Sequence, residues 1–158
     1  MITKNQMMPL LLAACPSFAQ AWAELQSEDE AELTYVCISR FIRHLRELHR
    51  AGDPSAFAAV AEVIERFHVE GDPYVSEAAT VGFLEDLLGD PGAEFFVSFL
   101  GPESCKWLAE VKAFWRGERH YIGEGLQRQL TEEDLRKIRE ELRVFNEKLR
   151  REREGQAS

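Results

Sequence analysis

The sequence predicts an all-α protein, an antiparallel helical stack or bundle that ends in a long amphipathic C-terminal helix. Three observations predict this fold class: a Gly-Asp-Pro tripeptide that occurs three times, apolar residues at helical spacing between the tripeptides, and a heptad pattern near the C-terminus. HEAT-like helical hairpins are one arrangement that fits these intervals. The chain of 158 residues has the usual size of one domain. We expect residues 1–130 to form a helical body and residues 131–158 to pack on it as the C-terminal helix.

The Gly-Asp-Pro tripeptides begin at Gly52, Gly71 and Gly89. Glycine tolerates the left-handed conformation that closes a helix, aspartate caps the next helix, and proline suits its first turn. Each tripeptide therefore predicts a tight corner, and helices joined by such short corners pack antiparallel. The apolar stripes between the corners are Phe57, Val60, Ala61, Ile64 and Phe67 in the first helix and Val81, Leu84 and Leu88 in the second.

The rest of the body is predicted from the same kind of pattern. The segments are helices over Ala14–Gln26, Ser27–Arg50, Glu94–Leu100 and Ser104–Arg116 and a loop or short hairpin over Gly117–Gln129. Ser27 is placed to cap the helix that follows it. Trp107, Phe114 and Trp115 recur at helical spacing on one short helix, which favours a place in the core.

The C-terminal helix has a clear start and a heptad seam. Thr131 and Asp134 resemble a capping box, and Leu130 and Leu135 are placed as a hydrophobic staple. The seam consists of Leu135, Ile138, Leu142, Phe145 and Leu149. Two heptads are short for a coiled coil, so we expect the helix to dock on its own domain, with a homodimer through the seam as the rival interpretation. Residues 150–158 are expected to be frayed.

The N-terminal segment admits two interpretations. The apolar run before Cys15 resembles a weak secretory signal within residues 1–21, and Leu12-Ala13-Ala14-Cys15 resembles a bacterial lipoprotein box. The run is short, Pro9 interrupts it and Lys4 is its only positive flank, so we favour a structural first helix. The three cysteines are scattered without C-x-x-C spacing, which predicts free, buried thiols.

The charge is negative and uneven. The net charge is −9, which disfavours binding to phosphate backbones and favours a basic partner. Between Gly52 and Gly101 there are ten carboxylates and one fixed cation, Arg66. Once the corner aspartates are set aside, the expected partner-binding acidic face consists of Glu62, Glu70, Glu77, Asp86 and Glu94.

No motif indicates catalysis, a cofactor or a metal site. The four histidines have no ligand spacing, and the chain has no phosphate-binding glycine loop or nucleophile motif. Glu65 and Glu85 lie on or beside apolar stripes, and a buried carboxylate needs a partner. We expect that partner among the arginines of the long helix, which are Arg40, Arg43, Arg46 and Arg50, the last three spaced along one side. The competing interpretation is a cryptic enzyme that uses Glu65, Glu85 and a nearby histidine.

Three stretches together resemble a known family. They are Val81-Gly82-Phe83-Leu84-Glu85-Asp86-Leu87, Phe99-Leu100-Gly101-Pro102-Glu103-Ser104 with Trp107 and Phe114-Trp115, and Pro16-x-Phe18 with Trp22. The set resembles small, all-helical, largely uncharacterised bacterial proteins that are often encoded in polymorphic-toxin neighbourhoods and serve there as immunity partners. The resemblance covers most of residues 15–116 and leaves the heptad helix outside, and its match at Pro16 supports treating the N-terminus as structural.

The resemblance implies that the chain neutralises a cognate toxin in the cytoplasm by direct binding, and it implies no catalytic residues. The leading hypothesis is therefore a non-catalytic immunity protein whose partner is a basic toxin domain. The alternative is a helical scaffold or adaptor that oligomerises through its C-terminal helix.

Overall fold

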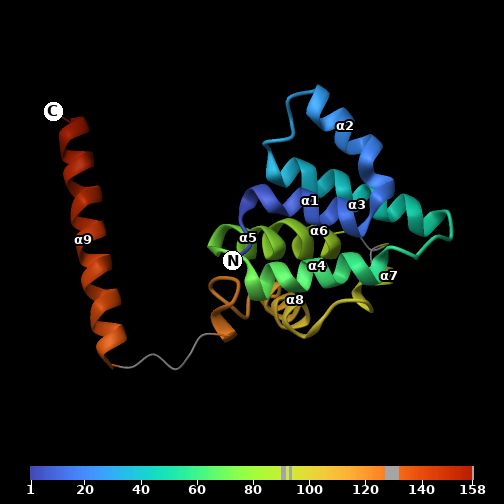
Figure 1. The fold of residues 1–158 in the computed structure, drawn as a ribbon. Helices are drawn as coiled ribbons and strands as arrows, with labels where there is room; N and C mark the ends of the chain where they lie inside the picture. The colour runs from blue at the N-terminus through green and yellow to red at the C-terminus, as the bar shows by residue number, and fades with distance from the viewer. Residues whose placement is uncertain (90–91, 93, 127–131, 158) are drawn as a thin grey trace. The chain divides into compact units, whose positions relative to one another are not determined.

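A computed structural model describes residues 1–89, 92, 94–126 and 132–157, with the backbone alone at residues 134, 135 and 157. The chain divides into two compact units, Met1–Gly125 and Leu126–Ser158. The described residues of both units are helical apart from turns and an isolated bridge between Ile2 and Gly71, which confirms the all-α fold class (Figure 1). None of the helices in these ranges is long and apolar enough to cross a membrane.

The first unit begins with a helix that belongs to its core. Helix α1 (Lys4–Ala14) starts where the side chain of Gln6 accepts a hydrogen bond from the backbone N–H of Thr3, at 2.9 Å. Met7, Met8 and Leu11 of α1 are buried. The favoured interpretation of a structural first helix therefore agrees with the fold, because a lipoprotein form cut before Cys15 would lose these core residues.

The following corner differs from the sequence prediction. A 3-10 turn (Pro16–Phe18) leads into α2 (Ala19–Ser27), and the long helix α3 (Thr34–Arg50) begins only after a six-residue connection. Ser27 is the last residue of α2 and its hydroxyl donates to the carbonyl of Glu24, so the prediction that Ser27 caps the long helix was wrong.

The first Gly-Asp-Pro corner joins α3 to α4 (Phe57–Glu70), and the two helices run antiparallel (Figure 1). Gly52 has φ +73°, the left-handed conformation that was predicted. Asp53 does not cap α4; its side chain accepts from the N–H and hydroxyl of Ser55, at 3.2 and 2.6 Å, which turns the chain before the helix starts. The predicted stripe of α4 is buried throughout.

The second corner is a direct cap. Asp72 accepts a hydrogen bond from the N–H of Val75 at 2.8 Å, and Pro73 opens α5 (Pro73–Glu77), as predicted. Gly71 is extended, with φ −71° and ψ 149°, so glycine is needed there for space rather than for a left-handed turn. A Cβ atom there would collide with the carbonyl oxygen of Phe67. The third tripeptide lies largely outside the described residues.

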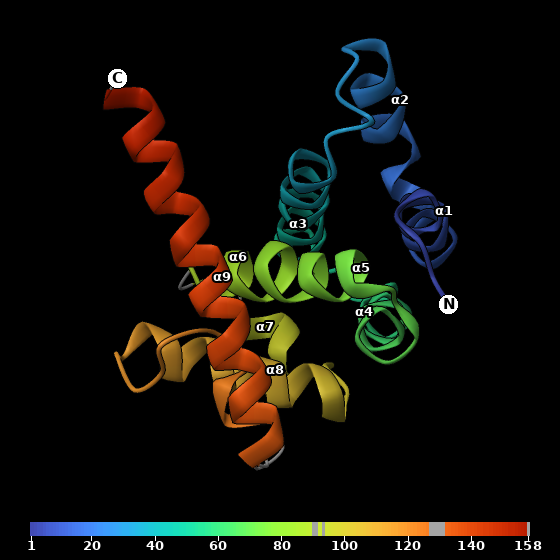
Figure 2. The same ribbon diagram turned by 90° about the vertical axis from the view of Figure 1, so that its left-hand side faces the viewer.

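Helix α5 continues into a π-helical segment (Ala78–Leu84) and then into α6 (Glu85–Leu88). Figure 2 shows α1, α3 and α4 nearly end-on and this continuous helix obliquely across them, between α3 and α8. The antiparallel prediction therefore fails for this helix. The π turn also shifts the helical period, which explains why Val81 is exposed although the stripe placed it inward.

The end of the first unit consists of α7 (Glu94–Val97), α8 (Pro102–Trp115) and a turn region with a 3-10 segment (Glu124–Leu126). Buried Glu110 organises the turns: it pairs with Arg119 at 3.1 Å and accepts the N–H of Gly125 at 3.0 Å. The segment before residue 127 is therefore held by a buried carboxylate, and its described part contains turns rather than a hairpin.

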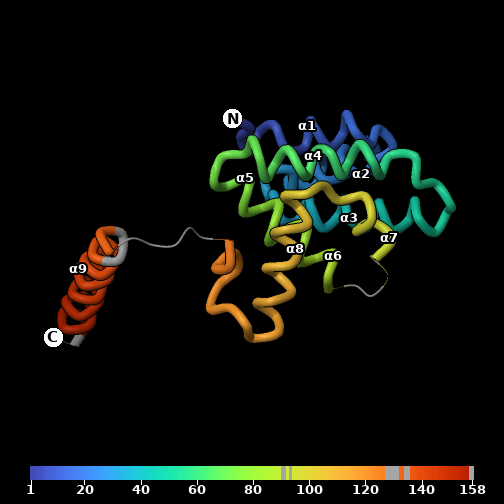
Figure 3. The backbone as a smooth tube through the Cα atoms, turned by 90° about the horizontal axis from the view of Figure 1, so that it is seen from below, coloured from blue at the N-terminus to red at the C-terminus, as the bar shows by residue number. Residues whose placement is uncertain are grey.

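The second unit contains α9 (Glu132–Ala157), the predicted C-terminal helix (Figure 3). The helix continues to Ala157, so the prediction of a frayed end was wrong. Arg143 and Arg151 both pair with Glu147 at one-turn spacing, which supports helix in this region. Of the predicted seam, Ile138, Leu142 and Phe145 are exposed and Leu149 is half-buried, and the side chain of Leu135 lies outside the description. Docking of α9 on the body stays a prediction.

Candidate protein-binding surface

The predicted acidic face is distributed over four helices of the first unit. Glu62 and Glu70 lie exposed on α4. Arg66 pairs with Glu70 at 2.6 Å, and this pair and the charge of Glu62 raise the pKa of Arg66. Glu77 is exposed at the end of α5. The two remaining members, half-buried Asp86 on α6 and exposed Glu94 on α7, have no recorded ion pair among the described residues. Partner binding by these five carboxylates stays a prediction.

A second surface gathers exposed apolar side chains around Tyr35. It consists of Tyr35, Val36, which lines one groove with it, and Tyr74, whose charge acts on the Tyr35 phenol; we call it the Tyr35 surface. The Tyr35 ring lies over Gly82 of the π segment, where a Cβ atom would be 3.5 Å from Tyr35 Cδ1 and 2.8 Å from Ile38 Cδ1. The absence of a side chain at Gly82 therefore brings α3 and the π segment together and seats the tyrosine between them.

Carboxylates border the Tyr35 surface. Burial raises the pKa of the Tyr35 phenol, and the charge of Glu77 raises it further. Tyr74 and half-buried Glu85 add to the same effect, so both lie close to the phenol. Tyr35 itself is 43% exposed and Val36 is 40% exposed. Exposed aromatic side chains within a polar rim are typical of protein interfaces.

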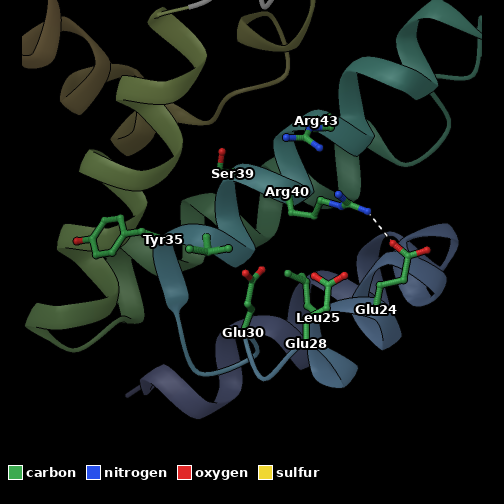
Figure 4. Close-up of a pocket in the computed structure, with 9 residues that line it drawn as sticks. Glu24, Leu25, Glu28, Glu30, Tyr35, Ser39, Arg40 and Arg43 are labelled. Atoms are coloured by element: carbon green, nitrogen blue, oxygen red, sulfur yellow. Dashed lines mark hydrogen bonds and ion pairs between the residues drawn. The ribbon is translucent and has the colours of Figure 1, made fainter.

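A groove of about 400 Å³ opens beside Tyr35, between α2 and the first half of α3 (Figure 4). We call it the α2–α3 groove; its lining is Glu24, Leu25, Glu28, Glu30, Tyr35, Val36, Ser39, Arg40 and Arg43. Arg40 is neutralised by Glu24, with 2.7 Å between Nη2 and Oε2. Glu28 and Glu30 stand on the α2 side without a recorded ion pair in the described part of the chain. The groove therefore has an apolar base and two unpaired carboxylates on one rim.

The acidic rim is held by a tight helix end. The N–H of Glu30 donates to the carbonyl of Leu25 at 2.9 Å, and the N–H of Asp29 donates to that of Gln26 at 3.3 Å. This pair of hydrogen bonds is a Schellman motif, which usually has glycine at its left-handed position. Here that position is Asp29, with φ +56°. The backbone on both sides of Asp29 is thus fixed, so Glu28 and Glu30 stand at defined places on the rim.

Sequence reasoning missed this groove. Five carboxylates, Glu24, Glu28, Asp29, Glu30 and Glu32, occur within nine residues that contain no basic residue. That local charge density was a usable signal. A helix that begins at Ser27 would spread these side chains around its surface, so the predicted helix Ser27–Arg50 gave no acidic rim.

Glu65 has a different partner from the one predicted. Its carboxylate accepts the N–H groups of Glu103 and Ser104 at 2.8 and 2.9 Å, together with the Ser104 hydroxyl at 2.8 Å. Burial opposes the charged form of Glu65, but these three hydrogen bonds outweigh it and lower the pKa of the carboxyl. Glu65 therefore caps the start of α8 from another helix instead of pairing with an arginine of α3. Helix N-terminal N–H groups supply the partner that a buried carboxylate needs.

Two half-buried histidines, His44 and His68, are relevant to the catalytic interpretation. Ser17 Oγ lies 2.7 Å from His44 Nε2, and Cys15 Sγ lies 3.5 Å from Ser17 Oγ. Burial lowers the pKa of His44, and Glu47 opposes that shift. A nucleophile–base pair also needs a group that orients the base, and no hydrogen bond between Glu47 and His44 is recorded within the described ranges. The observed bond fastens the α1–α2 corner to α3.

His68 is the other. It lies half-buried on α4 with its ring parallel to that of Trp107, 6.2 Å between centroids. In the described ranges neither of its ring nitrogens has a hydrogen-bond partner.

Some predicted core residues lie at the surface. Trp115 is 50% exposed and Phe114 is also exposed, so their core assignment was wrong, whereas Trp107 is half-buried. They are the last two residues of α8 (Pro102–Trp115). Cys15 and Cys37 are buried free thiols as predicted, but Cys105 is exposed.

The comparisons with known proteins concern the first unit. No curated protein and no solved structure matches the chain. One family model matches residues 8–116, which is more than half of the chain and includes the Tyr35 surface and the α2–α3 groove. Helix α9 lies beyond the match. The chain therefore belongs to the family described as a domain of unknown function, DUF7674.

Proposed function

We propose that the chain is a non-catalytic protein-binding domain, an immunity protein that neutralises a cognate bacterial toxin by direct binding in the cytoplasm. The observation that carries the binding proposal is the Tyr35 surface, where exposed aromatic and aliphatic side chains stand among carboxylates. Tyrosines in such settings are frequent energetic anchors of protein interfaces.

The charge of the first unit supports a basic partner. Met1–Gly125 contains ten basic and twenty acidic residues, a net charge of −10, whereas the remainder of the chain is nearly neutral. An acidic surface attracts a basic protein and suppresses contact with nucleic acid. A toxin that acts on nucleic acid would present a basic cleft. The immunity role itself rests on the resemblance of the three sequence stretches to immunity proteins.

The test is capture of the tagged full chain from its native host, followed by mass spectrometry and measurement of the dissociation constant. We expect one basic toxin domain at equal stoichiometry, with toxicity suppressed when both proteins are expressed together. Reversing Glu62, Glu77 and Asp86 to lysine tests the predicted acidic face, and Tyr35→Ser tests the Tyr35 surface. If both folded variants bind as tightly as the unmodified protein, neither surface is the binding site.

A second candidate function is a scaffold that forms a homodimer through α9. The observation in its favour is the exposure of Ile138, Leu142 and Phe145 along one seam of a 26-residue helix. Light scattering of the full chain and of a chain cut after residue 129 separates the two proposals. A dimer that becomes a monomer on truncation, with the body still folded, supports the scaffold. A monomer before and after truncation excludes it.

A further inference from the structure

We propose that the α2–α3 groove receives a segment of the partner protein in which a lysine or arginine follows a large apolar residue, with the cation between Glu28 and Glu30. This inference rests on the proposed function and adds to it the position and chemistry of the docking site. It differs from the acidic face predicted from sequence, because none of the groove residues belongs to that face.

The base of the groove is the part on which the apolar residue of the partner segment packs. Leu25 is buried beneath it, while Tyr35 and Val36 line it and remain exposed. An exposed tyrosine and an exposed valine beside a concave site leave apolar area that a partner can cover. Exposed ion pairs contribute little to affinity, so burial of this apolar area has to supply most of it.

The acidic rim of the groove is the part that binds the lysine or arginine of the partner segment. Arg40 is already paired with Glu24 at 2.7 Å, which leaves Glu28 and Glu30 as the acidic groups without a recorded pair within the described residues. Figure 4 shows both carboxylates on the α2 side of the groove, apart from Arg43 on α3. A lysine or arginine can lay its aliphatic stem along the apolar base and keep its charged head at such a rim.

The rim is also positioned in advance. The Schellman hydrogen bonds at Asp29 fix the backbone that carries Glu28 and Glu30, so little backbone freedom is lost when a cation binds. The charge therefore selects the segment and its direction, since the cation goes to the α2 side and away from Arg43.

The experiment is an NMR titration of the full chain with three blocked pentapeptides. The probe is acetyl-Leu-Arg-Leu-Arg-Leu-amide; its controls are the same peptide with glutamate for arginine and the same peptide with glycine for leucine. We expect saturable shifts of the Leu25 and Val36 methyl groups and the Tyr35 ring with the probe alone. The proposal would be overturned by chemical-shift changes spread over the whole acidic surface. It would also be overturned if the glycine peptide bound as tightly as the probe.

Two variants with the same change in net charge make the test specific. Glu28→Lys with Glu30→Lys should weaken the probe about tenfold, because two attractions become repulsions. Glu152→Lys with Glu154→Lys, at exposed sites of α9 that belong neither to the groove nor to the predicted acidic face, should change binding less than twofold. Equal weakening by both pairs would mean that net charge alone acts. If the rim variant fails to fold, Val36→Asp provides the same test from the apolar side, and unchanged binding there contradicts the proposal.

The natural partner separates this inference from the proposed function. If the captured toxin binds the folded Glu28→Lys, Glu30→Lys protein with an unchanged dissociation constant, the groove is not its docking site, although the protein-binding function stands. If no partner protein is captured at equal stoichiometry, the function itself fails. A loss of toxin binding of about tenfold in the rim variant, with the Glu152 and Glu154 control unaffected, supports the inference.

Discussion

Protonation of His68 should make the protein sensitive to mild acid. The imidazole lies against Trp107, and its two ring nitrogens lack hydrogen-bond partners in the described structure. Burial lowers the pKa of His68 from 6.5 to about 4, although the charges of Glu65 and Glu103 oppose the shift. A buried imidazole without partners has to stay neutral, because the charged form loses its hydration.

The sign and size of the effect follow from linkage. Between pH 6.5 and about 4 the unfolded chain binds a proton at this residue and the folded chain does not, so the free energy of unfolding decreases as the pH falls. Across this pH interval the free energy of unfolding decreases by about 3 kcal/mol, at about 1.4 kcal/mol per pH unit. Above pH 6.5 the contribution vanishes, and below pH 4 it no longer grows.

Urea unfolding of the full chain and of His68→Leu, measured at intervals from pH 7.5 to 4, tests this prediction. Leucine removes the titration and two unpaired nitrogens, so the variant should be at least as stable near pH 7 and should gain about 3 kcal/mol over the unmodified protein by pH 4. Comparing differences cancels the carboxylates that titrate in the same range. His120→Leu, at an exposed side chain, serves as the control. Parallel curves for the His68 variant and the unmodified protein would refute the burial argument.

Three further predictions concern stability and can be read from urea unfolding at pH 7. Glu65→Ala removes the cap of α8 and leaves the N–H groups of Glu103 and Ser104 without their partner, so it should cost about 1–3 kcal/mol; a cost below about 0.5 kcal/mol would contradict the capping role. Asp29→Gly relieves a left-handed non-glycine residue and should be neutral or stabilising by up to about 1 kcal/mol, whereas Asp29→Val should destabilise. Trp115→Ser should cost less than about 1 kcal/mol, because half of the indole is already exposed; a loss typical of core tryptophans, about 3–5 kcal/mol, would show that it is packed.

The parts of the fold that could be predicted depend on local physics. The α3–α4 corner follows from Gly52, and the start of α5 follows from Asp72 and Pro73, because left-handed glycine and N-caps act over three or four residues. The buried stripe of α4 follows from its period. The exposure of Val81 was not predictable in this way, since a π turn changes the helical period without any marker in the local sequence.

The partners of buried charges were less accessible to sequence reasoning. Glu65 was correctly expected to need a partner, but the choice between arginines and helix N–H groups depends on which helix end lies beside α4. That end is Glu103 and Ser104, which are 38 and 39 residues away in sequence. The same holds for the Tyr35 surface, whose position depends on Gly82 permitting close approach of α3.

The location of the proposed binding surfaces within the chain separates the two functional proposals physically. The α2–α3 groove and the Tyr35 surface belong to the first unit and to the segment shared with the DUF7674 family, residues 8–116. The seam of α9 belongs to the second unit and lies outside that segment. Binding through the groove should therefore survive Leu142→Asp, which removes the apolar seam. Dimerisation through α9 should likewise survive Glu28→Lys. A variant in either unit that abolishes both activities would mean that the two surfaces form one site, which would contradict the assignment of binding to the first unit alone.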